Sequence, residues 1–124
     1  MIYGDGEDRV ALENYCKTNG LTNVKFKQKW VELKYVPYIL SRSSLNILNY
    51  MPNPIARYGG SQSKSFQYMA SGKPICANIK FGYCPITKNN LGLAKDFINP
   101  EEYSKAILSF VKMDLKEYDS ICFN

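Results

Sequence analysis

The chain has 124 residues, of which 45% are apolar and 22% charged, a composition typical of one globular domain rather than of a disordered chain. It contains no histidine, which excludes Ser-His-Asp and Cys-His catalysis and every metal site that uses histidine. The net charge of +5 allows nucleic acid, anionic lipid or a phosphorylated small molecule as partner, but the lysines are scattered and the charge alone selects none of them.

Short apolar strands alternate with amphipathic helices along the sequence. In chain order we predict a strand over residues 2–3, a helix over 7–19, a strand over 24–26, a helix over 34–42, a strand over 45–48, a helix over 61–71, strands over 74–77 and 91–94, and a helix over 100–112. Residues 49–60 contain two prolines and two glycines and are predicted to form a long irregular loop. A loop of that length in a small domain is more often functional than not.

The alternation of strands and helices predicts the α/β class. We expect a parallel sheet of about five strands between helices on both faces, in three layers. In such sheets, ligands bind beyond the carboxyl ends of the strands, where a loop leads into a helix. Three such junctions in this sequence are candidate binding sites.

Two of the junctions carry weaker signals. Gly4-Asp5-Gly6 follows the first predicted strand, and its glycines let the backbone turn tightly beside a phosphate or ribose, although an ordinary tight turn explains the same residues. After the second predicted strand, Trp30 and Val31 offer a ring and an extended backbone to a planar base. The alternative is that Trp30 is a packing anchor.

The junction between the long loop and the following helix is the strongest candidate. Its polar and glycine residues are Gly59, Gly60, Ser61, Ser63, Lys64 and Gln67. Paired glycines admit an anion close to the main chain, and the free N–H groups of the helix start point towards it. Lys64 can neutralise a phosphate, and Gln67 lies on the same helix face, where its amide can bond a sugar diol. The alternative is a flexible glycine turn followed by a solvated lysine.

The cysteines and the hydropathy pattern indicate the compartment. Cys16, Cys76, Cys84 and Cys122 form no CxxC pair, so neither a zinc ribbon nor a redox pair is predicted, and we expect reduced, mostly buried thiols. No apolar run reaches the roughly 18–20 residues of a membrane span, and the N-terminus lacks a signal-peptide pattern. We therefore expect a cytoplasmic protein.

Several motifs of the sequence resemble the C-terminal half of GT-B fold glycosyltransferases, and look closest to the retaining group called family 4, or glycosyl transferases group 1. Asn23-Val24-Lys25-Phe26 is similar to the family's NVxFxG segment. Ser63-Lys64 and the run Tyr68-Met69-Ala70-Ser71-Gly72-Lys73-Pro74 are similar to its SxxKxxEYMAxGKP pattern. The resemblance spans nearly the whole chain and implies a Rossmann-like parallel sheet, whose strands here could close up in the flavodoxin-like order 2-1-3-4-5.

In relatives of this kind, the corresponding half binds a nucleotide-sugar donor. The resemblance implies that the pyrophosphate lies on the helix that begins near Ser61, that Gln67 holds the ribose and that residues 28–31 contact the base. Lys64 is then the catalytic residue, because a positioned cation stabilises the departing diphosphate without a metal or other cofactor. The parent enzyme is expected to transfer a hexose to a glycan or lipid-linked acceptor in cell-surface polysaccharide biosynthesis, peripherally at the inner face of the plasma membrane.

The sequence also departs from the family pattern. Gly59 and Gln67 stand where many relatives carry two glutamates, and Gln28 stands where the NVxFxG segment has glycine. Family domains begin with a further strand and helix, and the acceptor-binding N-terminal domain is missing. We therefore interpret residues 1–124 as a single partial domain, inactive alone, whose exposed sheet edges could pair with a second copy.

Two other functions stay open at this point. The chain could be a non-catalytic nucleotide-binding module, a degenerate glycosyltransferase in which Gly59 and Gln67 disable donor capture. Nucleic-acid binding is the weaker alternative, because basic and aromatic residues do not cluster along the sequence.

Overall fold

The computed structural model describes residues 1–51, 54–59 and 63–122. The chain divides into two compact units, Met1–Val36 and Pro37–Asn124. Its strands pair in parallel and alternate with helices, so the protein is of the α/β class, as the sequence predicts.

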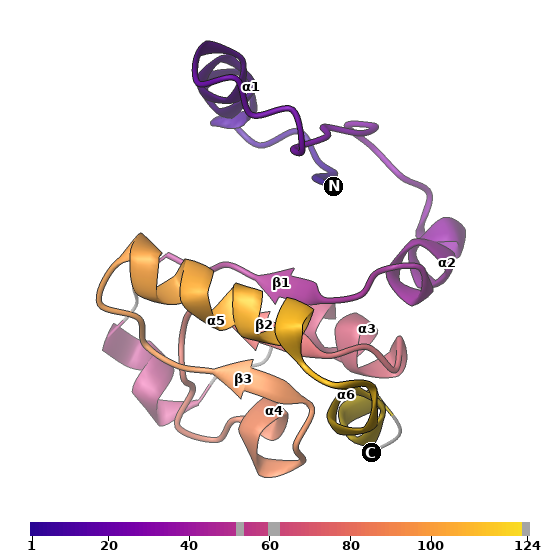
Figure 1. The fold of residues 1–124 in the computed structure, drawn as a ribbon, viewed down its shortest axis with the longest axis vertical. Helices are drawn as coiled ribbons and strands as arrows, with labels where there is room; N and C mark the ends of the chain where they lie inside the picture. Colours follow the sequence, from indigo (N-terminus) through magenta and orange to yellow (C-terminus); the bar gives the residue numbers. More distant parts are fainter. Residues whose placement is uncertain (52–53, 60–62, 123–124) are drawn as a thin grey trace. The chain divides into compact units, whose positions relative to one another are not determined.

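The helices and strands follow the predicted order, with additions (Figure 1). They are α1 (Arg9–Thr18), the 3-10 helix η1 (Leu33–Tyr35), α2 (Val36–Ser41), β1 (Asn46–Leu48), the 3-10 helix η2 (Pro54–Tyr58), α3 (Ser63–Ala70), β2 (Ile75–Ala77), α4 (Pro85–Lys88), β3 (Gly92–Ala94), α5 (Pro100–Lys112) and α6 (Leu115–Cys122). The predicted helix over 61–71 is confirmed as α3, although its first two predicted residues lie outside the described part of the chain.

In the first unit, the two predicted strands reduce to a single parallel bridge between Ile2 and Phe26. The Ile2 N–H donates to the Lys25 carbonyl, and the Lys27 N–H donates to the Ile2 carbonyl, both at 2.8 Å. Ile2 is 42% exposed, so this pairing has little buried apolar surface with which to extend into a full strand.

In the second unit, β1, β2 and β3 form a parallel sheet with β2 at the centre. Ile47 of β1 is in register with Cys76 of β2, which is in register with Leu93 of β3. The prediction of about five strands in the order 2-1-3-4-5 is therefore wrong in number, since the sheet of the described residues has three strands. The strands predicted over 45–48, 74–77 and 91–94 are confirmed within one residue at each end.

Helices cover both faces of this sheet, as predicted. On one face, buried side chains of the strands pack with residues of α3 and α4: Leu48, Ile75, Ala77, Cys84, Ile86 and Ala94, with Tyr68 and Met69 beside them. On the other face, Cys76 packs with Phe110 of α5 and Ile121 of α6. Figure 1 shows α5 lying across the sheet. Because β2 is buried on both sides, its three residues read as an uninterrupted apolar run.

Three elements are missing from the sequence prediction. The segment predicted as an irregular loop contains η2. No helix is predicted where α4 follows β2 or where α6 follows α5. Pro85 stands at the first position of α4, and the Asp114 carboxylate accepts from the Glu117 N–H at 3.0 Å before α6. Both are ordinary helix-start signals that identify short helices only after their packing is known.

Candidate functional site

A cleft of about 760 Å³ lies at the carboxyl ends of the three parallel strands of the second unit. Each strand contributes the residues that directly follow it, η2 forms a further wall, and the start of α5 completes the lining. The lining residues are Asn49, Tyr50, Pro54, Ala56, Arg57, Asn78, Ile79, Lys80, Asp96, Phe97, Ile98, Asn99, Pro100 and Tyr103. This is the edge of the sheet at which the α/β class prediction expects a ligand.

Side chains fasten the three strand ends to one another at the floor of the cleft. Asn78, after β2, accepts from the Tyr50 N–H at 2.8 Å and donates to the Tyr50 carbonyl at 2.9 Å. Asp96, after β3, accepts from the Lys80 N–H at 3.1 Å. These bonds continue the ladder where the parallel pairing stops, so the residues that line the cleft are held in fixed relation.

The wall formed by η2 rests on a close approach of two main chains. The Gly82 N–H donates to the Ala56 carbonyl at 3.1 Å, and a Cβ on Gly82 would lie 1.9 Å from the Arg57 carbonyl oxygen. Only glycine permits this contact, because any side chain would overlap the backbone of η2. Gly82 therefore places Arg57 and the segment after β2 beside each other.

Three charged residues line the cleft: Arg57, Lys80 and Asp96. The Asp96 carboxylate is already bonded to a backbone N–H, whereas neither Arg57 nor Lys80 forms an ion pair with a carboxylate of the described residues. The Arg57 guanidinium lies 4.9 Å from the centre of the Tyr58 ring. The cleft thus holds two cationic side chains available to an anionic ligand.

Aromatic rings make up much of the remaining lining. Phe97 and Tyr103 pack with their ring centres 4.8 Å apart, and the Tyr103 hydroxyl donates to the Cys76 carbonyl at 3.3 Å. Burial raises the pKa of Tyr103 far above its usual range, so this hydroxyl stays protonated. The pair offers an apolar surface of the kind on which a nucleobase packs.

The Tyr50 hydroxyl is a buried polar group of the cleft-lining segment. Its oxygen has no hydrogen-bond partner among the residues that the structure describes, while its ring meets Phe81 edge-on at 5.3 Å. Burial, and secondarily the neighbouring Tyr68 and Cys84, raises the pKa of the Tyr50 hydroxyl. The hydroxyl is therefore neutral, and it lies near Tyr68 and Cys84, which belong to the apolar core and not to the cleft lining.

The predicted residues at the start of α3 do not belong to the cleft lining as far as the described residues go. Ser63 and Lys64, the first two residues of α3, are exposed, and Gln67 is half-buried one turn later. Gly59 has φ +125°, a backbone conformation that favours glycine, so a glutamate at this position would strain the loop. Gly60 and Ser61 lie outside the described residues.

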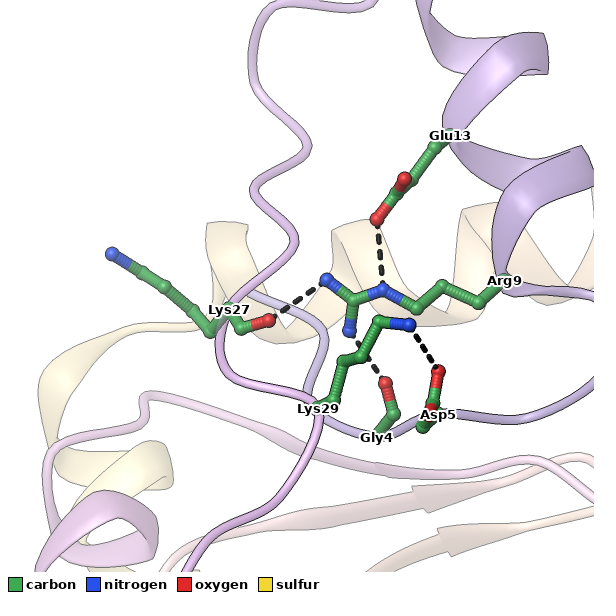
Figure 2. A network of polar contacts seen from close by, with 6 residues as sticks. All are labelled: Gly4, Asp5, Arg9, Glu13, Lys27 and Lys29. Carbon is green, nitrogen blue, oxygen red and sulfur yellow. Dashed lines mark hydrogen bonds and ion pairs between the residues drawn. The ribbon is translucent and has the colours of Figure 1, made fainter.

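In the first unit, Arg9 holds the predicted Gly4-Asp5-Gly6 turn (Figure 2). Its guanidinium donates to the Gly4 carbonyl, to the Lys27 carbonyl at 2.8 Å and to the Glu13 carboxylate at 2.8 Å. Asp5 pairs with Lys29 at 3.0 Å across exposed surface, and such a pair contributes little to stability. Sequence reasoning missed Arg9, whose signal is its place in the first helical turn, four residues before a glutamate.

The remaining predicted residues of the first unit are Trp30 and Val31. Trp30 is 74% exposed and Val31 is half-buried, so in this unit the indole is no packing anchor. The predicted site residues are thus divided between the two units, with Gly4, Asp5, Gly6, Trp30 and Val31 in the first and the residues of the α3 junction in the second.

Metal and membrane signals are absent from the described residues. Residues 1–51, 54–59 and 63–122 contain no group of three or more cysteine, aspartate or glutamate side chains that could hold a metal ion. No helix in the same part of the chain is long and apolar enough to span a membrane. Comparison with known proteins gives no match to the chain, whether to family models, to curated proteins or to solved structures.

Proposed function

We propose that the chain is the donor-binding part of a glycosyltransferase and that a nucleotide-diphosphate sugar binds in the cleft at the carboxyl ends of β1, β2 and β3. The position of the cleft carries the proposal, because nucleotides bind parallel sheets at this edge. The resemblance of residues 63–74 to the family 4 pattern adds the expectation of a Rossmann-like GT-B domain and of a hexose as the transferred group.

The chemistry of the cleft suits such a donor. A diphosphate needs cations or N–H donors, and the base and sugar need flat apolar surfaces with a few polar groups. Arg57 and Lys80 supply charge, Phe97 and Tyr103 supply rings, and Asn49 supplies an amide. In the proposed reaction, Lys64 and the cleft cations stabilise the negative charge that develops on the departing diphosphate.

A non-catalytic nucleotide-binding module is the second candidate. Gln67 stands where the family carries a glutamate, so a charge-assisted bond to the ribose would be lost. The glycine at position 59 is weaker support for this candidate than the glutamine at position 67. Its positive φ gives the glycine a conformational role, which explains its presence without a loss of function. Replacing Gln67 by glutamate separates the two candidates: a strong gain in donor affinity favours the degenerate module, and no gain favours a donor site to which glutamine is native.

The first experiment is calorimetry of the chain with UDP-, GDP- and CMP-linked sugars. We expect saturable binding of one of the two diphosphate classes, UDP- or GDP-linked, and weaker binding of the same donor by Lys64→Gln; the CMP-linked sugars carry a single phosphate and should bind more weakly. Lys116→Gln, an exposed change on α6, is the charge-matched control and should leave the affinity unchanged. Absence of saturable binding across the panel would overturn the proposal.

A further inference from the structure

We infer that Arg57 and Lys80 form a phosphate-binding pair in the cleft and take the diphosphate of the ligand. The inference deepens the proposed function and rests on it for the identity of the ligand, although the pair itself is defined by the cleft alone. Lys80 lies outside the α3 junction that the sequence singles out, and Arg57 lies at the start of that junction without being one of its predicted binding residues, so the pair is a second anion-binding element beside Lys64.

The first argument is an asymmetry of charge around the cleft. The nearby carboxylates are engaged within the protein: Asp96 accepts from the Lys80 N–H, and Glu102 accepts from the Ile98 N–H at 3.0 Å and from Lys95 at 2.6 Å. Arg57 and Lys80 have no carboxylate partner among the described residues. The charged residues of the lining are thus two cations without an ion-pair partner and one carboxylate, Asp96, so the net charge that faces an entering anion is positive.

The second argument is that the fold fixes the two residues in relation to each other. Lys80 lies two residues before Gly82, whose main chain is bonded to Ala56 and abuts the Arg57 carbonyl. The Lys80 main chain is in turn fastened to β3 through Asp96. Two segments distant in sequence thus present one cation each to the same cavity, which is the preorganisation that anion binding requires.

The third argument concerns the shape of the ligand. An arginine binds two phosphate oxygens through its planar fork, while a lysine provides a mobile point charge, so the pair suits two linked phosphates better than one carboxylate. The Phe97–Tyr103 rings line the same cleft and give the remainder of a nucleotide an apolar surface. The ligand class is therefore a diphosphate, free or carried by a nucleotide.

Calorimetry with inorganic pyrophosphate, UDP and uridine tests the pair. We expect Arg57→Gln and Lys80→Gln each to weaken binding of pyrophosphate and UDP about tenfold or more, and the double variant to abolish it, as for lost hydrogen bonds to charged groups. Uridine binding should not change. Arg57→Lys keeps the charge and should lose less than Arg57→Gln, and Lys116→Gln is the control. Circular dichroism of each variant verifies the fold.

The outcomes separate this inference from the proposed function. If a nucleotide sugar binds with an affinity that depends on Lys64 but not on Arg57 or Lys80, the assignment of the phosphate-binding pair is overturned and the proposed function stands. If pyrophosphate binds through Arg57 and Lys80 while no nucleotide sugar binds, the pair stands and the donor assignment falls. If the wild-type chain binds neither pyrophosphate nor a nucleotide, both are overturned.

Discussion

Asn78 joins the ends of two neighbouring strands by bonding both polar groups of one residue, Tyr50. Its Oδ1 accepts from the Tyr50 N–H at 2.8 Å, and its Nδ2 donates to the Tyr50 carbonyl at 2.9 Å. The Asn78 N–H also donates to the Leu48 carbonyl at 3.2 Å, so the two side-chain bonds between Asn78 and Tyr50 follow directly on the β1–β2 ladder. An amide side chain here replaces one further pair of backbone bonds and shapes the floor of the cleft.

Asn78→Ala is expected to destabilise the protein by about 1–3 kcal/mol, because it leaves the half-buried N–H and carbonyl of Tyr50 without partners. The free energy of unfolding, from urea denaturation followed by circular dichroism, measures the effect. Asn19→Ala removes one exposed amide bond to a helix carbonyl and is the control, with a smaller loss. Equal losses of unfolding free energy in the two variants would contradict the stabilising role of the Asn78–Tyr50 bonds.

Gly82→Ala should destabilise the second unit by about 1–3 kcal/mol and weaken ligand binding in the cleft. The added carbon would lie 1.9 Å from the Arg57 carbonyl oxygen, so η2 and the loop after β2 must separate. Gly6→Ala is the matched control for stability, because a Cβ there meets nothing within 4 Å. Thermal unfolding of both variants checks the difference, and an unchanged melting temperature for Gly82→Ala would argue against the close approach.

The alternation of apolar strands with helices was sufficient to predict the α/β class and the three strands of the sheet. The cleft could not be predicted in the same way, because its residues come together only through tertiary contacts. Nothing in the sequence around Gly82 shows that it touches η2, and an asparagine after a strand resembles many turn residues. Sequence patterns favoured glycine-rich junctions, whereas the cleft is lined by the residues that follow the strands, by η2 within the predicted long loop and by the start of α5.

Asn46 is the buried polar residue of the sheet, 5% exposed at the opposite end of β1 from the cleft. It accepts from the Ser43 hydroxyl at 2.7 Å and donates to the Ser71 hydroxyl at 2.9 Å. Asn46→Ala should lower the free energy of unfolding by about 1–3 kcal/mol, since two part-buried hydrogen bonds are lost, although the Ser43 and Ser71 hydroxyls each keep a bond to a backbone carbonyl. Nucleotide affinity should be unaffected in the folded variant, and a loss of binding with no loss of stability would contradict this structural role.

Cys76 should resist thiol reagents until the protein unfolds. Burial raises the pKa of its thiol to about 11, whereas the half-buried Cys16 and Cys122 are more accessible. Because the folded-state pKa lies above the ordinary value of 9.0, the neutral thiol favours folding below pH 9, and this stabilisation is lost as the pH rises towards 11. Mass spectrometry after brief alkylation at pH 8 measures each site. Modification of Cys76 as fast as that of Cys16 in the folded chain would contradict the prediction.

Glu102, in the first turn of α5, should make the stability of the protein depend on pH. Its carboxylate accepts from Lys95 and from the Ile98 N–H, and these bonds lower the pKa below the ordinary value of 4.5. A lowered pKa means that the charged form favours folding above pH 4.5 and that this contribution is lost as the pH falls through the folded-state value. Glu102→Gln should therefore be less stable than the wild type at pH 7, and the gap should close below pH 4.5.

Denaturation of the wild type and Glu102→Gln between pH 7 and pH 3 measures that gap. The control is Glu101→Gln, which removes an exposed carboxylate from the same helical turn and should show a smaller dependence on pH. Asn99 caps the helix by accepting from the Glu102 N–H at 2.8 Å, and neither substitution removes this backbone donor, so we expect the helix start to be otherwise preserved. A gap that stays constant across this range would show that Glu102 acts through packing and not through its charge.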